Sequence, residues 1–364
     1  MHFDLRPQLK DYPLEELSAR FERAGVAPYR AQQVHQWLYR RGVDDPHAMT
    51  DLALDLRSRL ASEWRSRALE LEGLQRSADG TLKGRLRAVD GAEVEAVAIP
   101  EDERTTLCIS TQVGCPLACS FCATGALGFE RNLSTAEIVD QLVRMRAVLD
   151  PGRRITNVVF MGMGEPLLNL PAVLRAVRIL MHPKGFGFAG RRITVSTAGV
   201  VPRLRELVAN APVNLAVSLH ATTDALRDVL VPLNRRFPLH ALIAELRSLE
   251  QITPRRPVFF EYTLMRGVND ALDDARRLVR LLKDLPSKVN VIPMNAHPDA
   301  PYEAPEPEQA SRFLGELARA GLTVTLRRNR GADIDAACGQ LARRAPAQAS
   351  VEGSRPLQPG PTRG

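Results

Sequence analysis

The segment Gly114-Cys115-Pro116-Leu117-Ala118-Cys119-Ser120-Phe121-Cys122 decides how the fold of this chain is interpreted. It follows a β-branched run at 106–111, so its three cysteines lie in a loop after a predicted strand. The chain has five cysteines, and the other two are Cys108 and Cys338. An odd number favours metal binding or thiol chemistry over a disulfide framework. The segment therefore predicts a metal site at the carboxyl end of a strand.

Around this segment, short β-branched runs alternate with segments of helical length. The predicted strands are 106–111, 155–161, 192–196, 213–218, 258–263, 288–292 and 323–326. The predicted helices are 135–149, 170–181, 201–209, 223–230, 239–251, 270–283 and 307–320. Such alternation is typical of the α/β class with a parallel sheet. We expect a partial (β/α)6 barrel whose active site lies at the carboxyl ends of its strands.

The N-terminal part has a different pattern. Apolar spacing of three and four residues predicts helices at 14–24, 29–40 and 49–63, and Asp79-Gly80 and Asp90-Gly91 are hairpin signals. The last residues are rich in Pro, Gly, Ser, Arg and Gln, without apolar periodicity. We expect a helical domain over 1–70, a β-hairpin extension over 71–100, the barrel over 101–343 and a disordered tail over 344–364.

The charge of the chain favours a polyanionic partner. Forty-nine Lys and Arg residues against 42 Asp and Glu give a net charge of +7. Arginines and aromatics alternate in one predicted helix, as in surfaces that contact RNA; its candidate residues are Tyr29, Arg30, Gln33, Trp37, Tyr39, Arg40 and Arg41. The alternatives are a solvated basic surface and a small core built by Val34 and Trp37.

The chain has no apolar stretch that approaches the roughly 20 residues of a membrane span. Residues 1–10 carry charges of both signs and lack the apolar region of a secretory signal. We therefore expect no membrane association and a cytoplasmic location.

The spacing of the three cysteines predicts a particular kind of metal site. Three thiolates can hold three irons of a 4Fe–4S cluster and leave the fourth iron open to a bidentate ligand. Cys-x3-Cys-x-aromatic-Cys resembles the signature of the radical S-adenosylmethionine (SAM) superfamily, whose members fold as full or partial barrels. A zinc knot is the alternative, but it prefers paired Cys-x2-Cys spacing, and no second pair is present.

The chain as a whole resembles the RlmN/Cfr family of RNA adenine methyltransferases, from about 14 to 342. Several motifs carry the resemblance in the same order: Val94-Glu95-Ala-Val-Ala-Ile-Pro, Thr106-Leu-Cys108-Ile-Ser, Gly162-Met-Gly164-Glu165-Pro-Leu-Leu-Asn169, Ser196-Thr-Ala-Gly-Val-Val, Ser218-Leu219-His220, Asn295 and Gly331-Ala-Asp-Ile-Asp-Ala-Ala-Cys338-Gly-Gln340. Gly164-Glu165-Pro166 resembles the RlmN branch, which methylates C2 of adenine, more than the Cfr branch, which modifies C8.

The resemblance implies a role for each matched residue. Cys115, Cys119 and Cys122 would hold the 4Fe–4S cluster. SAM would be bound by Gly164, Glu165, Ser196, Ser218, Leu219, His220 and Asn295. We expect Glu165 to neutralise the SAM ammonium, because a buried carboxylate would otherwise lack a partner. Cys338 would carry the methyl group, Glu95 would accept a proton, and Cys108 would release the product by forming a transient disulfide. The predicted strand places Cys108 near its start, and two buried inert thiols are the alternative reading of Cys108 and Cys338.

The resemblance also implies the partners. The substrates would be 23S rRNA at the peptidyl transferase centre and tRNA at the adenosine 3′ of the anticodon. Two SAM molecules would be used per methylation, and a donor such as flavodoxin would supply electrons to a monomeric enzyme. The alternatives are C8 methylation, a radical SAM activase or thioether-forming enzyme, and a non-enzymatic iron–sulfur assembly factor that binds RNA.

Overall fold

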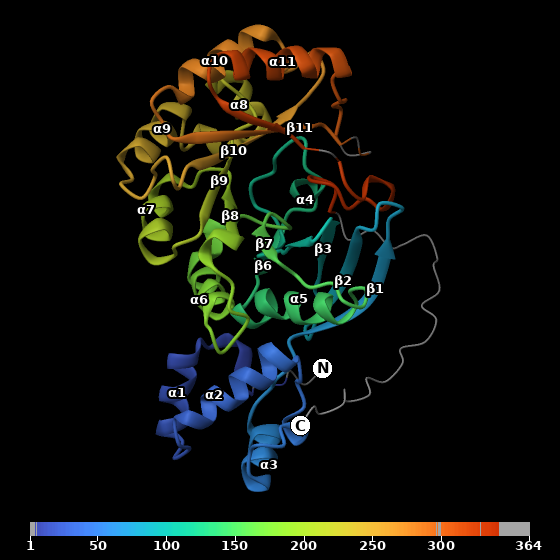
Figure 1. Ribbon diagram of the computed structural model, residues 1–364, viewed down its shortest axis with the longest axis vertical. Helices are drawn as coiled ribbons and strands as arrows, with labels where there is room; N and C mark the ends of the chain where they lie inside the picture. Colours follow the sequence, from blue (N-terminus) through green and yellow to red (C-terminus); the bar gives the residue numbers. More distant parts are fainter. Residues whose placement is uncertain (1–3, 5, 296, 298–299, 328, 342–364) are drawn as a thin grey trace.

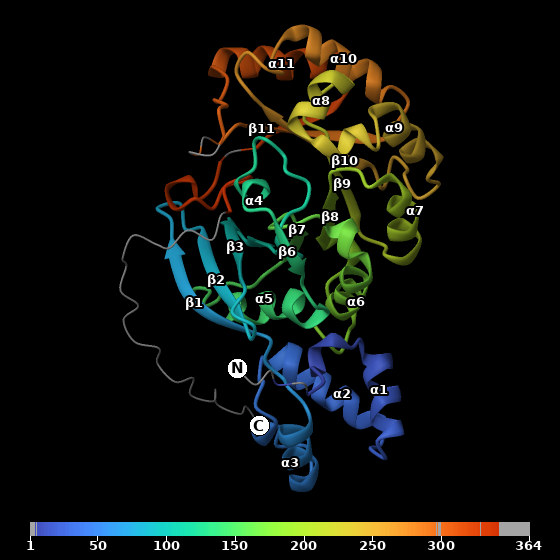
Figure 2. The same cartoon turned by 180° about the vertical axis from the view of Figure 1, so that it is seen from behind.

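The computed structural model describes residues 4, 6–295, 297, 300–327 and 329–341. In Figures 1 and 2 the N-terminal helices form one end of the molecule and helices α10 and α11 the other, with the strands between them. The tail expected over 344–364 lies outside the described residues.

A ten-stranded sheet organises the chain, in the order β1-β2-β3-β4-β7-β8-β9-β10-β11-β12. Strands β1 to β4 are antiparallel, and from β4 onward every neighbouring pair is parallel. Their bounds are β1 Leu69–Arg76, β2 Leu82–Ala88, β3 Glu93–Glu101, β4 Arg104–Cys108, β7 Asn157–Phe160, β8 Ile193–Thr197, β9 Asn214–Ser218, β10 Val258–Leu264, β11 Ser287–Pro293 and β12 Thr323–Leu326. Both predicted hairpins are present, since β1–β2 and β2–β3 turn at Gly80 and Gly91 with positive φ.

Helices connect the parallel strands in sequence order. They are α5 Thr135–Ala147, α6 Leu170–Met181, α7 Val201–Asn210, α8 Asp224–Leu230, α9 Leu239–Ser248, α10 Leu272–Leu282 and α11 Pro307–Arg319. Six strand-to-helix units thus lead from β4 to β12. Because β12 pairs only with β11 among the described strands, the barrel is partial, and this confirms the predicted fold class.

The cysteine segment interrupts the first of these units. Strand β4 ends at Cys108 instead of continuing to Thr111, and a short β5 at Gln112–Gly114 pairs with β6 at Phe129–Asn132. Helix α4, Ala123–Ala126, lies between them. The predicted strand at 106–111 was therefore too long, because alternating apolar residues on both sides of the break hide where the pairing partner changes.

The N-terminal helices are α1 Leu14–Arg23, α2 Tyr29–His35 and α3 Leu54–Glu63, and α2 continues as a π-helical turn over Gln36–Arg41. Tyr39 is fully buried and Trp37 nearly so, with its indole donating to Asp51 at 2.6 Å. The alternative of a small core built by Val34 and Trp37 is therefore confirmed, and Tyr39 belongs to the same core; the interpretation of these two aromatics as RNA contacts was wrong. Tyr29 stays 58% exposed, and Arg40 and Arg41 are exposed.

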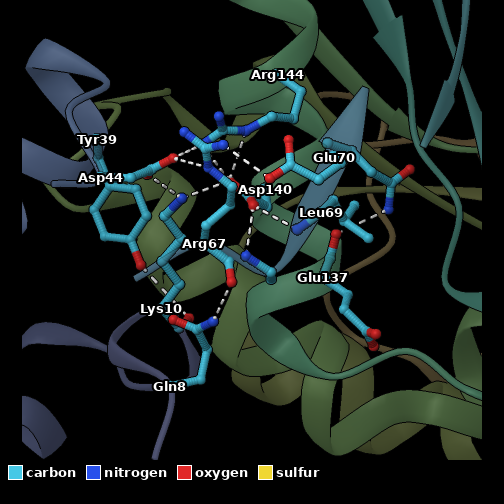
Figure 3. A network of polar contacts seen from close by, with 12 residues as sticks. Gln8, Lys10, Tyr39, Asp44, Arg67, Leu69, Glu70, Glu137, Asp140 and Arg144 are labelled. Carbon is cyan, nitrogen blue, oxygen red and sulfur yellow. Dashed lines mark hydrogen bonds and ion pairs between the residues drawn. The ribbon is translucent and has the colours of Figure 1, made fainter. Parts of the chain in front are cut away.

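A buried ionic network fastens these helices to the barrel (Figure 3). Lys10 lies 2.6 Å from Asp44 and 2.5 Å from Asp140 on α5, and Arg144 pairs with the same two carboxylates. The second oxygen of Asp140 accepts the backbone amides of Ala68 and Leu69 at 2.9 Å. Arg67 also lies 3.4 Å from Asp44, so three cations surround two carboxylates where the two parts of the chain meet.

Candidate active site

A cavity of about 950 Å³, including its open mouth, lies at the carboxyl ends of the parallel strands. The described residues that line it come from every strand-end loop of the barrel: Cys115, Leu117, Cys119, Phe121, Cys122, Phe160, Met161, Gly162, Gly164, Glu165, Pro166, Ser196, Thr197, Ala198, Ser218, His220, Val231, Glu261, Thr263, Ile292, Met294, Arg327, Cys338 and Gly339.

The three clustered cysteines share one side of this cavity. Burial raises the pKa of Cys115 to about 12 and that of Cys119 well above its ordinary value, and the neighbouring cysteines add to both shifts. All three come from one loop and line the same cavity, with room for a ligand beside them. Cys115, Cys119 and Cys122 therefore fit the ligand set of a 4Fe–4S cluster with one open iron.

No three His, Cys, Asp or Glu side chains among the described residues converge on a single ion position. A cluster does not require this, because each cysteine thiolate binds a different iron.

The loop that carries Cys338 is hydrogen-bonded to the start of helix α4, which directly follows the cysteine segment. Ala123 donates its backbone amide to Gly339 O at 2.7 Å, and the Thr124 hydroxyl donates to Leu341 O at 2.7 Å. Cys338 itself is exposed into the cavity. Its enclosure by the cavity walls raises the pKa of its thiol, and the nearby Arg327 guanidinium acts in the opposite direction.

Cys108 lies at the carboxyl end of β4 and not near the start of a strand, so the placement expected from the longer predicted strand was wrong. Burial raises the pKa of its thiol to about 12, and the charge of Cys338 adds to this shift. All five cysteines are free, so Cys108 and Cys338 form no disulfide here.

Glu95 is buried on β3, outside the lining of the cavity. Its carboxylate lies 3.5 Å from Lys83 Nζ, and Lys83 also donates to Asp335 O at 3.2 Å. The backbone oxygen of Glu95 accepts a hydrogen bond from the Ser110 hydroxyl at 2.7 Å. Lys83 therefore joins Glu95 to the loop that carries Cys338.

Glu165 is 3% exposed and is held by the protein itself. One of its oxygens accepts the amide of Leu167 at 3.0 Å and the other the amide of Ala198 at 2.8 Å. Burial nevertheless raises its pKa. The expectation that Glu165 would lack a partner was wrong, because the loop after β8 supplies one.

Gly164 has a φ of +97°, and a Cβ there would come within 2.5 Å of Gln112. The side-chain oxygen of Gln112 accepts the amide of Glu165 at 2.8 Å. Glycine is therefore required for packing against Gln112, independently of any ligand.

Ser196, Ser218 and His220 line the cavity on neighbouring strands. His220 has a φ of +58°, unusual for a residue with a side chain, and its ring meets Phe121 edge-on at 4.6 Å. Burial lowers its pKa to about 3, and its Nδ1 accepts the amide of Thr263 at 3.0 Å. Its ring is thus neutral. Leu219, by contrast, is fully buried outside the cavity lining.

Asn295 lies next to the cavity and contacts the Cys338 loop. Its side-chain amide donates to Cys338 O at 3.1 Å, while its Oδ1 is buried without a hydrogen-bond partner among the described residues. Asn295 therefore keeps one acceptor for a ligand.

Sequence analysis missed Arg227 on α8, which is fully buried. Its guanidinium donates to Ala198 O at 2.6 Å, Ser218 O at 3.0 Å and Leu219 O at 3.0 Å. Arg227 thereby ties the loops after β8 and β9 together. Its position in a helical pattern is the same as that of a solvated surface arginine, so the sequence carries no signal for this role.

Glu261 on β10 and Arg327 after β12 were also missed as site residues, although both line the cavity. The charge of Arg327 acts on Glu261, Cys338 and Cys108 together. Two adjacent arginines at 327–328 are typical of a surface loop, so the sequence pattern does not indicate a site residue here.

The comparisons agree with this geometry. Residues 109–282 match the radical SAM superfamily, and residues 7–65 match the N-terminal domain of ribosomal RNA large subunit methyltransferases. The dual-specificity RNA methyltransferases RlmN of Anaeromyxobacter sp. (strain Fw109-5) and Geobacter sulfurreducens are each 48% identical to this chain; the matches cover 93% of it and 91% and 92% of those proteins. The chain belongs to the RlmN family.

A solved structure supports the same conclusion. The radical SAM methyltransferase from Sphaerobacter thermophilus superposes with a TM-score of 0.87 at 46% identity, over 92% of this chain and 99% of that one. As a member of the RlmN family, the chain is a radical SAM RNA methyltransferase, and its cofactors are a 4Fe–4S cluster and SAM. The assembly-factor alternative is thereby set aside. No helix in the described part of the chain is long and apolar enough to cross a membrane.

Proposed function

We propose that this enzyme methylates C2 of an adenine in 23S rRNA and in tRNA, through a methyl group carried on Cys338. The observation that carries the proposal is the presence of four of the five cysteines in the lining of one cavity. Cys115, Cys119, Cys122 and Cys338 line it, and Cys108 ends β4, the first of the parallel strands. An ordinary methyltransferase needs no such set of thiols.

C2 of adenine explains why a carrier thiol is needed. This carbon is electron-poor and has no lone pair, so it cannot displace a methyl group directly. When bound, the cluster and SAM supply the methyl group and the radical chemistry that such a carbon requires. Cys338 gives up its thiol proton and holds the methyl group as a thioether. Arg327 supports the first of these steps, because its positive charge favours the thiolate.

Release of the product needs a second thiol. Once the Cys338 sulfur is joined to the base through the methyl carbon, Cys108 attacks that sulfur, and the carbon–sulfur bond breaks as the sulfur–sulfur bond forms. The electron pair stays with the methylene carbon, Glu95 accepts the proton that leaves C2, and the methylene carbon takes up a proton to become the methyl group. A Cys108–Cys338 disulfide remains. The position of Cys108 at the end of β4 supports this role. For Glu95, support comes from the resemblance and from Lys83, which joins it to the Cys338 loop.

SAM is assigned to the rim between the cysteine segment and β9. Its ammonium would meet Glu165 and the backbone at Gly164, while Ser196, Ser218, His220 and Asn295 would contact its ribose and carboxylate. Leu219 contributes no lining side chain, so its part is limited to the backbone turn that orients Ser218 and His220. The unpartnered Oδ1 of Asn295 supports its assignment.

The RNA substrates follow from the family. The word "dual-specificity" in the names of the relatives supports two RNA classes. The target base would be unstacked and inserted into the cavity mouth, as base-modifying enzymes require. Tyr29, Arg40 and Arg41 are exposed on the N-terminal helices and are available for the RNA. A flavodoxin-type donor, a monomeric state and a cytoplasmic location stay predictions.

The decisive test is a trapping experiment. Cys108→Ala protein is incubated anaerobically with cluster, SAM, dithionite and an rRNA fragment, and the RNA is examined on a denaturing gel. A covalent protein–RNA adduct that disappears in the Cys108→Ala/Cys338→Ala double variant supports the proposal. Free methylated RNA from the Cys108→Ala enzyme would refute the release step.

A further inference from the structure

One buried carboxylate that lines the cavity, Glu261, has no role in the proposed function. Glu261 is the register partner of Ser218 on β9 and of Asn290 on β11. Glu261 and Thr263 share one face of β10 and both line the cavity, whereas Tyr262 points the other way and stacks on Phe313 of α11. Glu261 therefore lies one pleat deeper in the barrel than Thr263.

The two carboxylate oxygens of Glu261 differ in their surroundings. Oε1 accepts the side-chain amide of Asn290 at 2.8 Å. Oε2 is buried and has no hydrogen-bond partner among the described residues, although Glu261 is only 5% exposed. A buried carboxylate oxygen without a donor is costly, so it indicates a ligand that supplies one.

The neighbours of Glu261 do not satisfy this oxygen. Arg327 lies on the same cavity and its charge partly offsets the burial that raises the pKa of Glu261. Its guanidinium nevertheless donates no hydrogen bond to Oε2. Asn295 likewise has a buried Oδ1 without a hydrogen-bond partner among the described residues.

The chemistry of a carboxylate restricts what it binds. In its ionised form, which the charge of Arg327 favours, it is acceptor-only, so its ligand must present an N–H or O–H group. A phosphate of the RNA backbone and the carboxylate of SAM are excluded, because both are anionic acceptors. In an adenosine the available donors are the 6-amino group and the ribose hydroxyls. Both ligands of the proposed reaction, SAM and the target nucleotide, contain an adenosine.

We propose that Oε2 of Glu261 accepts a hydrogen bond from an adenosine bound in the cavity, and that Glu261 is a further binding residue of this enzyme. The inference rests on the proposed function for the identity of the two adenosine ligands. Asn290 orients the carboxylate by holding Oε1.

The test is the Glu261→Gln variant, which keeps the shape of the side chain and removes its charge. Affinity is measured by equilibrium dialysis with cluster-containing protein, separately for SAM and for an RNA fragment that contains the target adenosine. We expect about a tenfold or greater loss of affinity for one of them. Loss for SAM alone assigns the donor to SAM, and loss for the RNA alone assigns it to the target nucleotide.

Stability separates a binding role from a structural one. Because Oε2 has no partner, Glu261→Gln without ligand should melt at or above the temperature of the parent protein. Asp274→Asn is the matched control: it removes another buried carboxylate, on α10 and outside the cavity lining, and should leave both affinities unchanged. If Glu261→Gln does not fold, Glu261→Asp is measured in the same way, since it keeps the charge and withdraws the oxygen.

Unchanged affinity for both ligands in the folded variant would overturn the proposal, as would an equal loss of affinity in Asp274→Asn. The readout is binding and not methylation. A failure here is therefore distinct from a failure of the proposed function, which would show as parent enzyme that binds SAM and RNA but forms no 2-methyladenosine.

Discussion

The ammonium group of Lys10 lies 2.5 Å from Asp140 Oδ1, although 130 positions separate the two residues in the chain. Burial lowers the pKa of Lys10 to about 8, and the charge of Asp140 opposes this shift. The residue after Asp140 continues the connection: Gln141 exchanges hydrogen bonds of 2.8 and 2.9 Å with the backbone of Ser110, whose hydroxyl bonds to Glu95 O. The attachment of the N-terminal helices is thus contiguous with the site.

Lys10→Met should destabilise the protein strongly. Removing the cation leaves Asp44 and Asp140 buried with less compensation, and breaking a buried ion pair in this way costs about 3–5 kcal/mol. Urea unfolding followed by circular dichroism measures the change. The surface pair Arg59–Glu63 provides the control, since both side chains are more than 40% exposed and Arg59→Ala should cost about 1 kcal/mol or less. Equal effects of the two substitutions would contradict the account of the network.

Arg227→Met should loosen the rim of the cavity. It removes the guanidinium donors to Ala198 O, Ser218 O and Leu219 O, of which Leu219 O still accepts the amide of Ala221. We expect a loss of about 2–4 kcal/mol in stability and a weaker affinity for SAM in protein that still folds. Urea unfolding and equilibrium dialysis measure the two effects. Arg227→Lys should recover only part of either, since an ammonium group cannot reproduce the planar fork; full recovery would argue against the role of the guanidinium.

Substitution of a cluster ligand and substitution of the methyl carrier should have different effects on iron content and on methylation. Cys119→Ser should lower the iron content after reconstitution and abolish SAM cleavage. Cys338→Ala should keep both the iron and the brown colour of the cluster while losing methylation. Iron analysis and chromatography of the SAM products measure these outcomes. Loss of iron in Cys338→Ala would mean that Cys338 is a ligand and not a carrier.

His35 should make the stability depend on pH. Burial lowers its pKa from about 6.5 to about 3, and both ring nitrogens are buried without hydrogen-bond partners among the described residues. Between these values the unfolded chain binds a proton that the folded chain does not, so the free energy of unfolding falls as the pH falls from 6.5 toward 3. His35→Leu should reduce this slope by about 1.4 kcal/mol per pH unit. Urea titrations at pH 4.5 and 6 test this, and an unchanged slope would show that His35 is protonated in the fold.

The barrel could be predicted because its strands and helices carry local signals. The bounds of β12, 323–326, and of α6, 170–181, agree with the predicted ranges, since apolar periodicity and β-branched runs are properties of neighbouring residues. The break between β4 and β5 carries no local signal, because it depends on which strand each half pairs with. For the same reason Cys108 was placed at the wrong end of its strand.

The candidate site could be predicted only where a motif marks it. Cys115, Cys119 and Cys122 are recognisable from their spacing alone. Glu261 stands in an apolar strand, and Arg227 in an ordinary helical pattern. Their importance arises from burial against distant parts of the chain, which no sequence window contains. Trp37 and Tyr39 show the converse, since their basic neighbours suggest a surface that tertiary packing places inside.

The most direct test of the central claim is analysis of the methylated nucleoside. The reconstituted enzyme is incubated anaerobically with SAM, dithionite and unmodified rRNA or tRNA fragments, and the RNA is digested for mass spectrometry. The account predicts 2-methyladenosine together with 5′-deoxyadenosine and S-adenosylhomocysteine, and its loss in Cys338→Ala. Formation of 8-methyladenosine, or of 2-methyladenosine by the Cys338→Ala enzyme, would contradict it.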